Sequence, residues 1–169
     1  MTSTKRVKSI VPTVVLGLLT LGLTSTSASA SSTATATIAV TANVVDSCTI
    51  SATALSFGTY SGTALPAQAT ITVTCTDLGT YTVGLNGGTT TGGTDQARLL
   101  AGPSTYTLAY NLYTTSALTT IWGNTSAHNW QSGTGTGSAQ TLTVYGNIAA
   151  GQTLYVGSYT DSVTATITY

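Results

Sequence analysis

Very few side chains in this sequence are of a type that could carry out chemistry. The 169 residues include one histidine, two cysteines, four acidic and four basic residues. His128 lies in a polar, glycine-rich stretch, and the sequence contains no G-x-S-x-G nucleophile motif. We therefore interpret His128 as an exposed loop histidine and predict that the protein is not an enzyme and uses no cofactor.

The two cysteines, Cys48 and Cys75, are the other candidates. They lack the paired spacing that a zinc site needs, so no metal site is expected. In an exported chain, an even pair of cysteines indicates a disulfide. Closing the 27-residue span between them should stabilise the fold by ~3–4 kcal/mol in the chain-entropy model.

Export is predicted by residues 1–30, which have the features of a signal peptide. Three basic residues precede an apolar run at 10–23, and Ala28-Ser29-Ala30 forms a cleavage site of small residues. The run has 14 residues, fewer than the ~18 of a membrane-spanning helix, so no membrane insertion is expected after signal removal. Removal leaves Arg98 as the single cation against four aspartates. One cation argues against binding to nucleic acid or to anionic lipid.

The elements that must position the cysteines are predicted to be strands. Residues that favour strands and turns are abundant, whereas common helix formers are scarce after residue 30. Cys75 belongs to a run at 69–76 in which apolar residues alternate with threonines, which places Cys75 on the apolar face. A bridge to Cys48 would then join two strands of one core. The fold class is predicted to be all-β.

Short alternating runs at this spacing predict an immunoglobulin-like β-sandwich. Besides 69–76, we expect strands at 81–85, 108–112, 140–146, 154–159 and 162–169, and a long flexible loop at 123–139. The last run has no successor, so the sandwich is expected to be incomplete, with its last strand missing. A gap beside residues 163–169 would leave main-chain groups and core side chains exposed.

The longest alternating run lies at the other end of the sequence, at 33–44. It reads TATATIAVTANV, with apolar residues at even positions and mainly threonines at odd positions. An uncharged, β-prone arm is an aggregation hazard unless a strand pairs with it. Our hypothesis is that a second copy or a close relative accepts this arm in its gap. The expected organisation is a signal peptide at 1–30, a donor strand at 31–45 and an incomplete domain at 46–169.

Five segments carry a resemblance to a known family: Cys48-Thr49-Ile50, Leu55-Ser56-Phe57-Gly58, Ile71-Thr72-Val73-Thr74-Cys75, Tyr145-Gly146-Asn147-Ile148 and Gly157-Ser158-Tyr159-Thr160-Asp161-Ser162-Val163. They resemble the spore coat protein U domain family, which includes Csu-type pilus subunits of the archaic chaperone–usher pathway. The resemblance implies a sandwich without its last strand. A periplasmic chaperone lends a strand first, and the outer-membrane usher then exchanges it for the N-terminal strand of the next subunit.

Carried over to this sequence, the resemblance places the donor side chains at Ala36, Ile38, Val40, Ala42 and Val44. It places the edge of the acceptor groove, which also binds the chaperone, at Val163, Ala165, Ile167 and Tyr169. The implied protein is a rod or minor subunit of a secreted surface pilus, or fimbrium, that serves cell adhesion and biofilm formation. Its implied partners are neighbouring subunits, the chaperone and the usher.

Two alternatives belong to other classes. A secreted spore-coat-like structural protein would form a layer instead of a filament. A glycan-binding adhesin subunit would stack sugars on Trp122, Trp130, Tyr106 and Tyr113, although ordinary packing is the preferred interpretation of these aromatic residues. Glycan binding by an isolated monomer would distinguish the adhesin.

Overall fold

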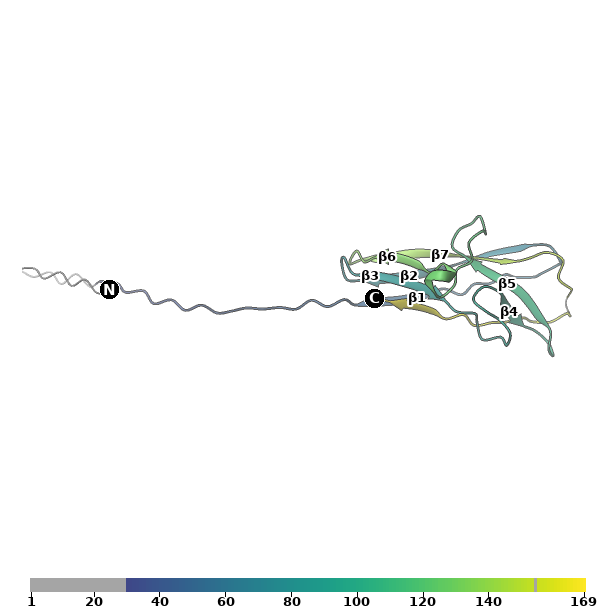
Figure 1. Ribbon diagram of the computed structural model, residues 1–169, viewed down its shortest axis with the longest axis horizontal. Coiled ribbons are helices and arrows are strands. Elements are labelled where there is room, and N and C mark those ends of the chain that lie inside the picture. The colour runs from purple at the N-terminus through teal and green to yellow at the C-terminus, as the bar shows by residue number, and fades with distance from the viewer. Residues whose placement is uncertain (1–29, 154) are drawn as a thin grey trace, which may run out of the picture. The chain divides into compact units, whose positions relative to one another are not determined.

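The computed structural model describes residues 30–153 and 155–169 (Figure 1). The chain divides into two compact units, Met1–Thr41 and Ala42–Tyr169. The predicted signal peptide lies outside the described residues, except for Ala30. Residues 30–47 form neither strand nor helix, and all of them are exposed. Within the described residues, no helix is long and apolar enough to cross a membrane.

The second unit is a β-sandwich of two antiparallel sheets, so the prediction of an all-β fold is confirmed. The larger sheet has the strand order β1-β2-β7-β5-β4, and the smaller has the order β6-β3-β8. The elements are β1 (Cys48–Ala52), β2 (Leu65–Cys75), β3 (Thr80–Leu85), β4 (Arg98–Ala101), β5 (Thr107–Tyr113), the 3₁₀ turn η1 (Ser126–His128), β6 (Gln131–Thr134), β7 (Ala139–Ile148) and β8 (Ala165–Thr168). The edge strands β1 and β8 belong to different sheets and lie side by side (Figure 1).

The predicted alternation places the core residues. Apolar side chains at every second position of β2, β3 and β5 point inward, while threonines occupy many of the positions between them. The core consists of Ile71, Val73, Cys75, Tyr81, Val83, Leu85, Leu108, Tyr110, Leu112, Trp122, Val144 and Ile148. The Trp122 indole N–H donates to the Val83 carbonyl at 2.9 Å, so this tryptophan is a core residue.

The expected disulfide is confirmed. Cys48 and Cys75 are bonded with an S–S distance of 2.00 Å. They are direct partners in the β1–β2 register, so the bridge attaches the edge strand β1 to the core strand β2. The apolar face predicted for Cys75 is the face that is buried.

Three local expectations were wrong. The stretch 123–139 contains β6, although its sequence has no apolar alternation. This strand forms because it pairs with β3, and because the absence of a side chain at Gly133 leaves room for the Tyr81 ring. Of the strand expected at 154–159, residue 154 lies outside the described residues, and residues 155–159 form no strand. The last strand, expected over 162–169, is limited to β8, where β3 supplies its partner.

Arg98, the only cation after residue 8, is fully buried in the sandwich. Its Nε donates to the Asn86 carbonyl at 2.9 Å, and its Nη2 donates to the Leu85 and Trp122 carbonyls at 2.9 and 2.8 Å. Burial lowers the pKa of Arg98, while Tyr110 and two aspartates nearby raise it. The guanidinium stays charged and ties the end of β3 to the segment that contains Trp122.

Candidate functional site: a groove between two unpaired walls

A groove of about 1080 Å³ opens the core of the sandwich to the surface. We call residues 52–62, which begin at the last residue of β1, the first wall, and residues 155–165, which end at the first residue of β8, the second wall; all of them except Thr164 line the groove. Between them the groove is lined by core residues of both sheets: Ile71, Leu85, Leu108, Tyr110, Leu112, Val144 and Ile148. The groove is therefore a gap in the sandwich that has an apolar floor.

The first wall is held in place mainly by side chains. The main-chain N–H of Thr53 bonds to the Thr70 carbonyl at 2.9 Å, but residues 54–61 make no main-chain to main-chain hydrogen bond within the described residues. The Tyr60 hydroxyl donates to the Ala149 carbonyl at 2.9 Å, and the Phe57 ring packs edge-on against Tyr110 at 5.8 Å. The main chain of this wall is thus free to pair with another strand.

Before β8 begins, the main chain of the second wall is hydrogen-bonded at two points. Thr160 exchanges two main-chain hydrogen bonds with Ala101, at 2.7 and 2.9 Å. Thr164 accepts from the Asn86 N–H at 3.1 Å and donates to Asn86 Oδ1 at 2.9 Å. Between these points, residues 161–163 make no main-chain to main-chain hydrogen bond in the described part of the chain. The groove therefore has a free main-chain edge on both sides.

The structure separates the residues predicted for the groove edge. Val163 and Ala165 line the groove. Ile167 lies further along β8, where it is half-buried and packs against the core. Tyr169 is 57% exposed and lines a different hollow.

The residues predicted as donor side chains are all exposed. The exposed fractions are 84% for Ile38, 87% for Val40 and 86% for Val44, and Ala36 and Ala42 are also exposed. Because these large aliphatic side chains are exposed, burying them against a partner would release the full free energy of their transfer out of water.

Sequence reasoning missed two features of the groove. The first wall was not assigned, although the alternation of Leu55 and Phe57 indicates an inward-facing apolar side. Asp161 was noted only as part of a motif, and it is the one acidic residue that lines the groove. Burial alone would raise the pKa of Asp161. Hydrogen bonds from Tyr110, Thr89 and Thr90 lower this pKa by more than burial raises it, so the net shift is downward.

We expect acid to destabilise the fold through Asp161 and Asp95. The pKa of Asp95 is also lowered, because hydrogen bonds from His128 and Asn124 outweigh the effect of burial. A carboxyl group whose pKa is lower in the folded than in the unfolded protein stabilises the fold at pH values above its unfolded pKa of ~3.9. This stabilisation is lost as the pH falls through the folded pKa. The urea midpoint should be flat from pH 7 to about pH 5 and decline below it. The decline should be shallower for Asp161→Asn and unchanged for the exposed control Asp77→Asn; a midpoint that rises on acidification would contradict this expectation.

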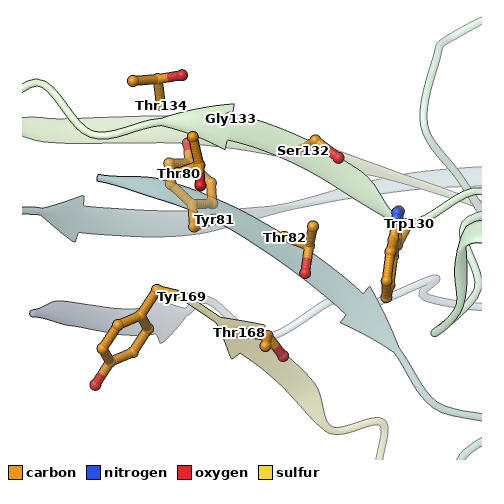
Figure 2. A pocket seen from close by; sticks show the side chains of 9 residues that line it. All are labelled: Thr80, Tyr81, Thr82, Trp130, Ser132, Gly133, Thr134, Thr168 and Tyr169. Carbon is orange, nitrogen blue, oxygen red and sulfur yellow. The ribbon is translucent and has the colours of Figure 1, made fainter. Parts of the chain in front are cut away.

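A second, shallower hollow of about 650 Å³ lies over the three-stranded sheet. Figure 2 shows its hydroxyl side chains on neighbouring strands, with Trp130 at one end and Tyr169 at the other. Of the four aromatic residues considered for sugar stacking, Trp130 alone lines this hollow. Trp122 is buried in the core, Tyr106 stacks on Tyr155 at 4.1 Å, and Tyr113 is half-buried in β5. These four residues therefore form no common platform.

His128 pairs with an aspartate of a neighbouring loop. Its Nδ1 lies 2.8 Å from Asp95 Oδ2, and 44% of its side chain is exposed. The Asn124 N–H bonds to the same oxygen at 3.1 Å. Within the described ranges, no group of three histidine, cysteine, aspartate or glutamate side chains is arranged to hold a metal ion. The pair therefore joins two loops.

Residues 34–166 match the model of the Spore Coat Protein U domain, and the chain belongs to this family. It is 34% identical over 145 residues to Protein U of Myxococcus xanthus, a match that covers 76% of this chain and 80% of that protein. The resemblance expected from the sequence is confirmed.

Among solved structures, the fold is similar to one in the CsuC–CsuE complex. That complex joins a chaperone and a tip adhesion subunit before assembly of the archaic chaperone–usher Csu pili of Acinetobacter baumannii. The TM-score is 0.53 at 23% identity, and the match covers 75% of this chain but 40% of the other. The prediction of an immunoglobulin-like sandwich is confirmed, and this likeness is one of fold.

Proposed function

We propose that this protein is a structural subunit of a surface filament that assembles by donor-strand exchange. The N-terminal arm of one copy, or of a close relative, would fill the groove of the next. The observation that carries the proposal is a core groove with a free main-chain edge on both sides, in a chain that also has an unpaired, alternating, exposed arm.

The arm and the groove match in length and in chemistry. Each wall extends over about eleven residues, and the alternating arm at 33–44 has a similar length. As a strand, the arm would turn Ala36, Ile38, Val40, Ala42 and Val44 toward the apolar floor. Its threonine face would remain toward solvent.

The typical free energies of burial and hydrogen bonding favour the strand exchange. Burying Ile38, Val40 and Val44 would give ~1.5–3 kcal/mol each, and roughly eight to ten main-chain hydrogen bonds would add ~0.5–1.5 kcal/mol each. Ordering and docking subtract several kcal/mol. The inserted strand could leave only when the sandwich opens, so the assembly would persist for kinetic reasons.

The same groove defines the other partners in the proposal. An open apolar groove is an aggregation hazard, so the newly exported subunit needs a temporary cover. A periplasmic chaperone would lend a strand along the edge that Val163 and Ala165 form at the groove and that continues along β8 past Ile167 to Tyr169, and an outer-membrane usher would exchange it for the next arm. The protein would be exported after removal of residues 1–30, with residues 31–45 as donor strand and 46–169 as acceptor domain.

Refolding of the chain without residues 1–30 tests this function. We expect polymers whose length grows with protein concentration, measured by sedimentation velocity, because each copy carries both an arm and a groove. A species that stays monomeric up to high concentration, with its arm still sensitive to protease, would contradict donor-strand exchange.

The similarity to Protein U of Myxococcus xanthus favours one second candidate, a secreted coat protein. A coat component could use the same strand exchange to build a layer. Electron microscopy of the assembled protein distinguishes the two, because a filament subunit gives unbranched fibres and a coat protein gives sheets.

A further inference from the structure

Asp161 lies where the second wall passes from one sheet to the other. Just before it, Thr160 pairs with Ala101 at the end of β4, in the five-stranded sheet. Just after it, β8 pairs with β3, in the three-stranded sheet. Because residues 161–163 lack main-chain to main-chain hydrogen bonds within the described residues, the Asp161 side chain is the attachment of the wall at this crossing.

The Asp161 carboxylate accepts hydrogen bonds from both sides of the sandwich. Its Oδ1 accepts from the N–H groups of Thr89 and Thr90, at 2.8 and 3.2 Å, and from both threonine hydroxyls at 3.2 Å. Its Oδ2 accepts from the Tyr110 hydroxyl at 2.7 Å. Thr89 and Thr90 follow β3, whereas Tyr110 belongs to β5. One side chain thus joins the wall to both sheets.

The turn Asn86-Gly87-Gly88 is shaped to receive this carboxylate. Gly88 has a φ of +83°, and a Cβ atom at this position would collide with the Asp161 carboxylate. Asn86 Oδ1 accepts from the Gly88 N–H at 3.1 Å and from the Thr164 N–H at 2.9 Å. The turn therefore bonds to the second wall at Thr164 and leaves room at Gly88 for the Asp161 carboxylate.

Neutral donors hold the Asp161 charge. None of the hydrogen-bond donors to Asp161 among the described residues is a lysine, arginine or histidine side chain. Hydrogen bonds to an ionised carboxylate are stronger than those between neutral groups, and the lowered pKa of Asp161 keeps it ionised at neutral pH. The attachment is therefore strong, and of the main-chain groups of residues 161–163 it uses only the Ser162 N–H, which bonds to the same carboxylate.

We propose that Asp161 is a positioning residue for strand capture, which fixes the second wall in the arrangement that accepts a donor strand. This inference rests on the proposed function. Because the wall is already ordered, the incoming strand does not bear the entropy cost of ordering it. Because the attachment is made by a side chain, the main-chain groups of residues 161–163 other than the Ser162 N–H stay available for the donor.

The test measures strand capture with Asp161→Asn. The background is the chain from Ser31 to Tyr169 with Ile38→Asp and Val40→Asp, which keeps the groove and removes the competing donor. The probe is a fluorescent peptide with the sequence of residues 33–45. We expect Asp161→Asn to slow peptide association about ten-fold and to change dissociation much less, since the lost contacts order the wall before binding.

Asp77→Asn is the matched control, because Asp77 is exposed in the turn after β2 and the substitution makes the same change of charge. It should leave both rates unchanged. Tyr110→Phe removes a single donor from Asp161 and should slow association about three-fold. In NMR spectra of Asp161→Asn, the chemical shifts of the Thr89 and Thr90 amide protons should move toward those of amides without a hydrogen bond.

The outcomes separate the two proposals. If the background protein captures the peptide and Asp161→Asn captures it at the same rate, the role of Asp161 is overturned and the proposed function stands. If the background protein captures no peptide, the proposed function fails, and the positioning role fails with it. Should Asp161→Asn not fold, Tyr110→Phe decides, and an unchanged association rate for that variant overturns the inference.

Discussion

Replacing Ile38 and Val40 with aspartate is expected to abolish assembly while leaving the domain folded. Both side chains are exposed, so the change removes no contact from the fold. In the groove, the variant would lose the burial of two large aliphatic groups, ~1.5–3 kcal/mol each, and would bring two charges against an apolar floor. We expect the affinity between copies to fall at least a thousand-fold, measured by sedimentation velocity, with circular dichroism as the check of folding.

The opposite face of the arm supplies the matched control. Thr37→Asp with Thr41→Asp adds the same two charges to the same arm, but on the side that faces solvent when the apolar face is inserted. This control should assemble within about ten-fold of the unchanged protein. Assembly of the Ile38 and Val40 variant at the normal level, or equal losses in both variants, would show that the apolar face does not enter the groove.

The second large effect is expected at Arg98. Its replacement by methionine keeps most of the volume but leaves three carbonyl groups, those of Asn86, Leu85 and Trp122, without their donor. An unsatisfied buried polar group costs about 1–3 kcal/mol, so the free energy of unfolding should fall by roughly 4 kcal/mol or more. A domain of this size has about 5–15 kcal/mol in total, and the variant is expected to be largely unfolded near 40 °C.

Urea unfolding of the chain without residues 1–30, followed by circular dichroism, measures this effect. Arg98→Lys is the control, because it keeps the charge and loses the fork of donors that reaches several carbonyls. It should lie between the unchanged protein and Arg98→Met. A loss below about 1 kcal/mol for Arg98→Met would mean that the three carbonyls find other donors and that Arg98 does not hold the end of β3.

The parts of the fold that were predictable have a local signature. The strands β2 and β5 follow from the period-two alternation of their own residues, and the disulfide follows from two cysteines in a chain for which a signal peptide is predicted. β6 has no such signature, because the absence of a side chain at Gly133 and the partner strand β3 decide its conformation. The burial of Arg98 was also not predictable, because its carbonyl partners come from segments far apart in the sequence.

The candidate site also has a part that the sequence predicts and a part that depends on contacts formed only in the fold. Val163 and Ala165 were expected at a gap beside the last strand, and both line the groove. The first wall was not expected, because its conformation depends on anchors such as Tyr60 to Ala149, which lie 89 residues apart. The role of Asp161 likewise depends on Thr89 and Thr90, brought together with it only by the fold.

The most direct test is the structure of the assembled protein at a resolution that shows side chains. Residues 36–44 of one copy should lie as an extra strand between residues 52–62 and 155–165 of its neighbour, with Ile38, Val40 and Val44 on the apolar floor. A groove that is empty in the assembly, or closed by the arm of its own chain, would contradict the account.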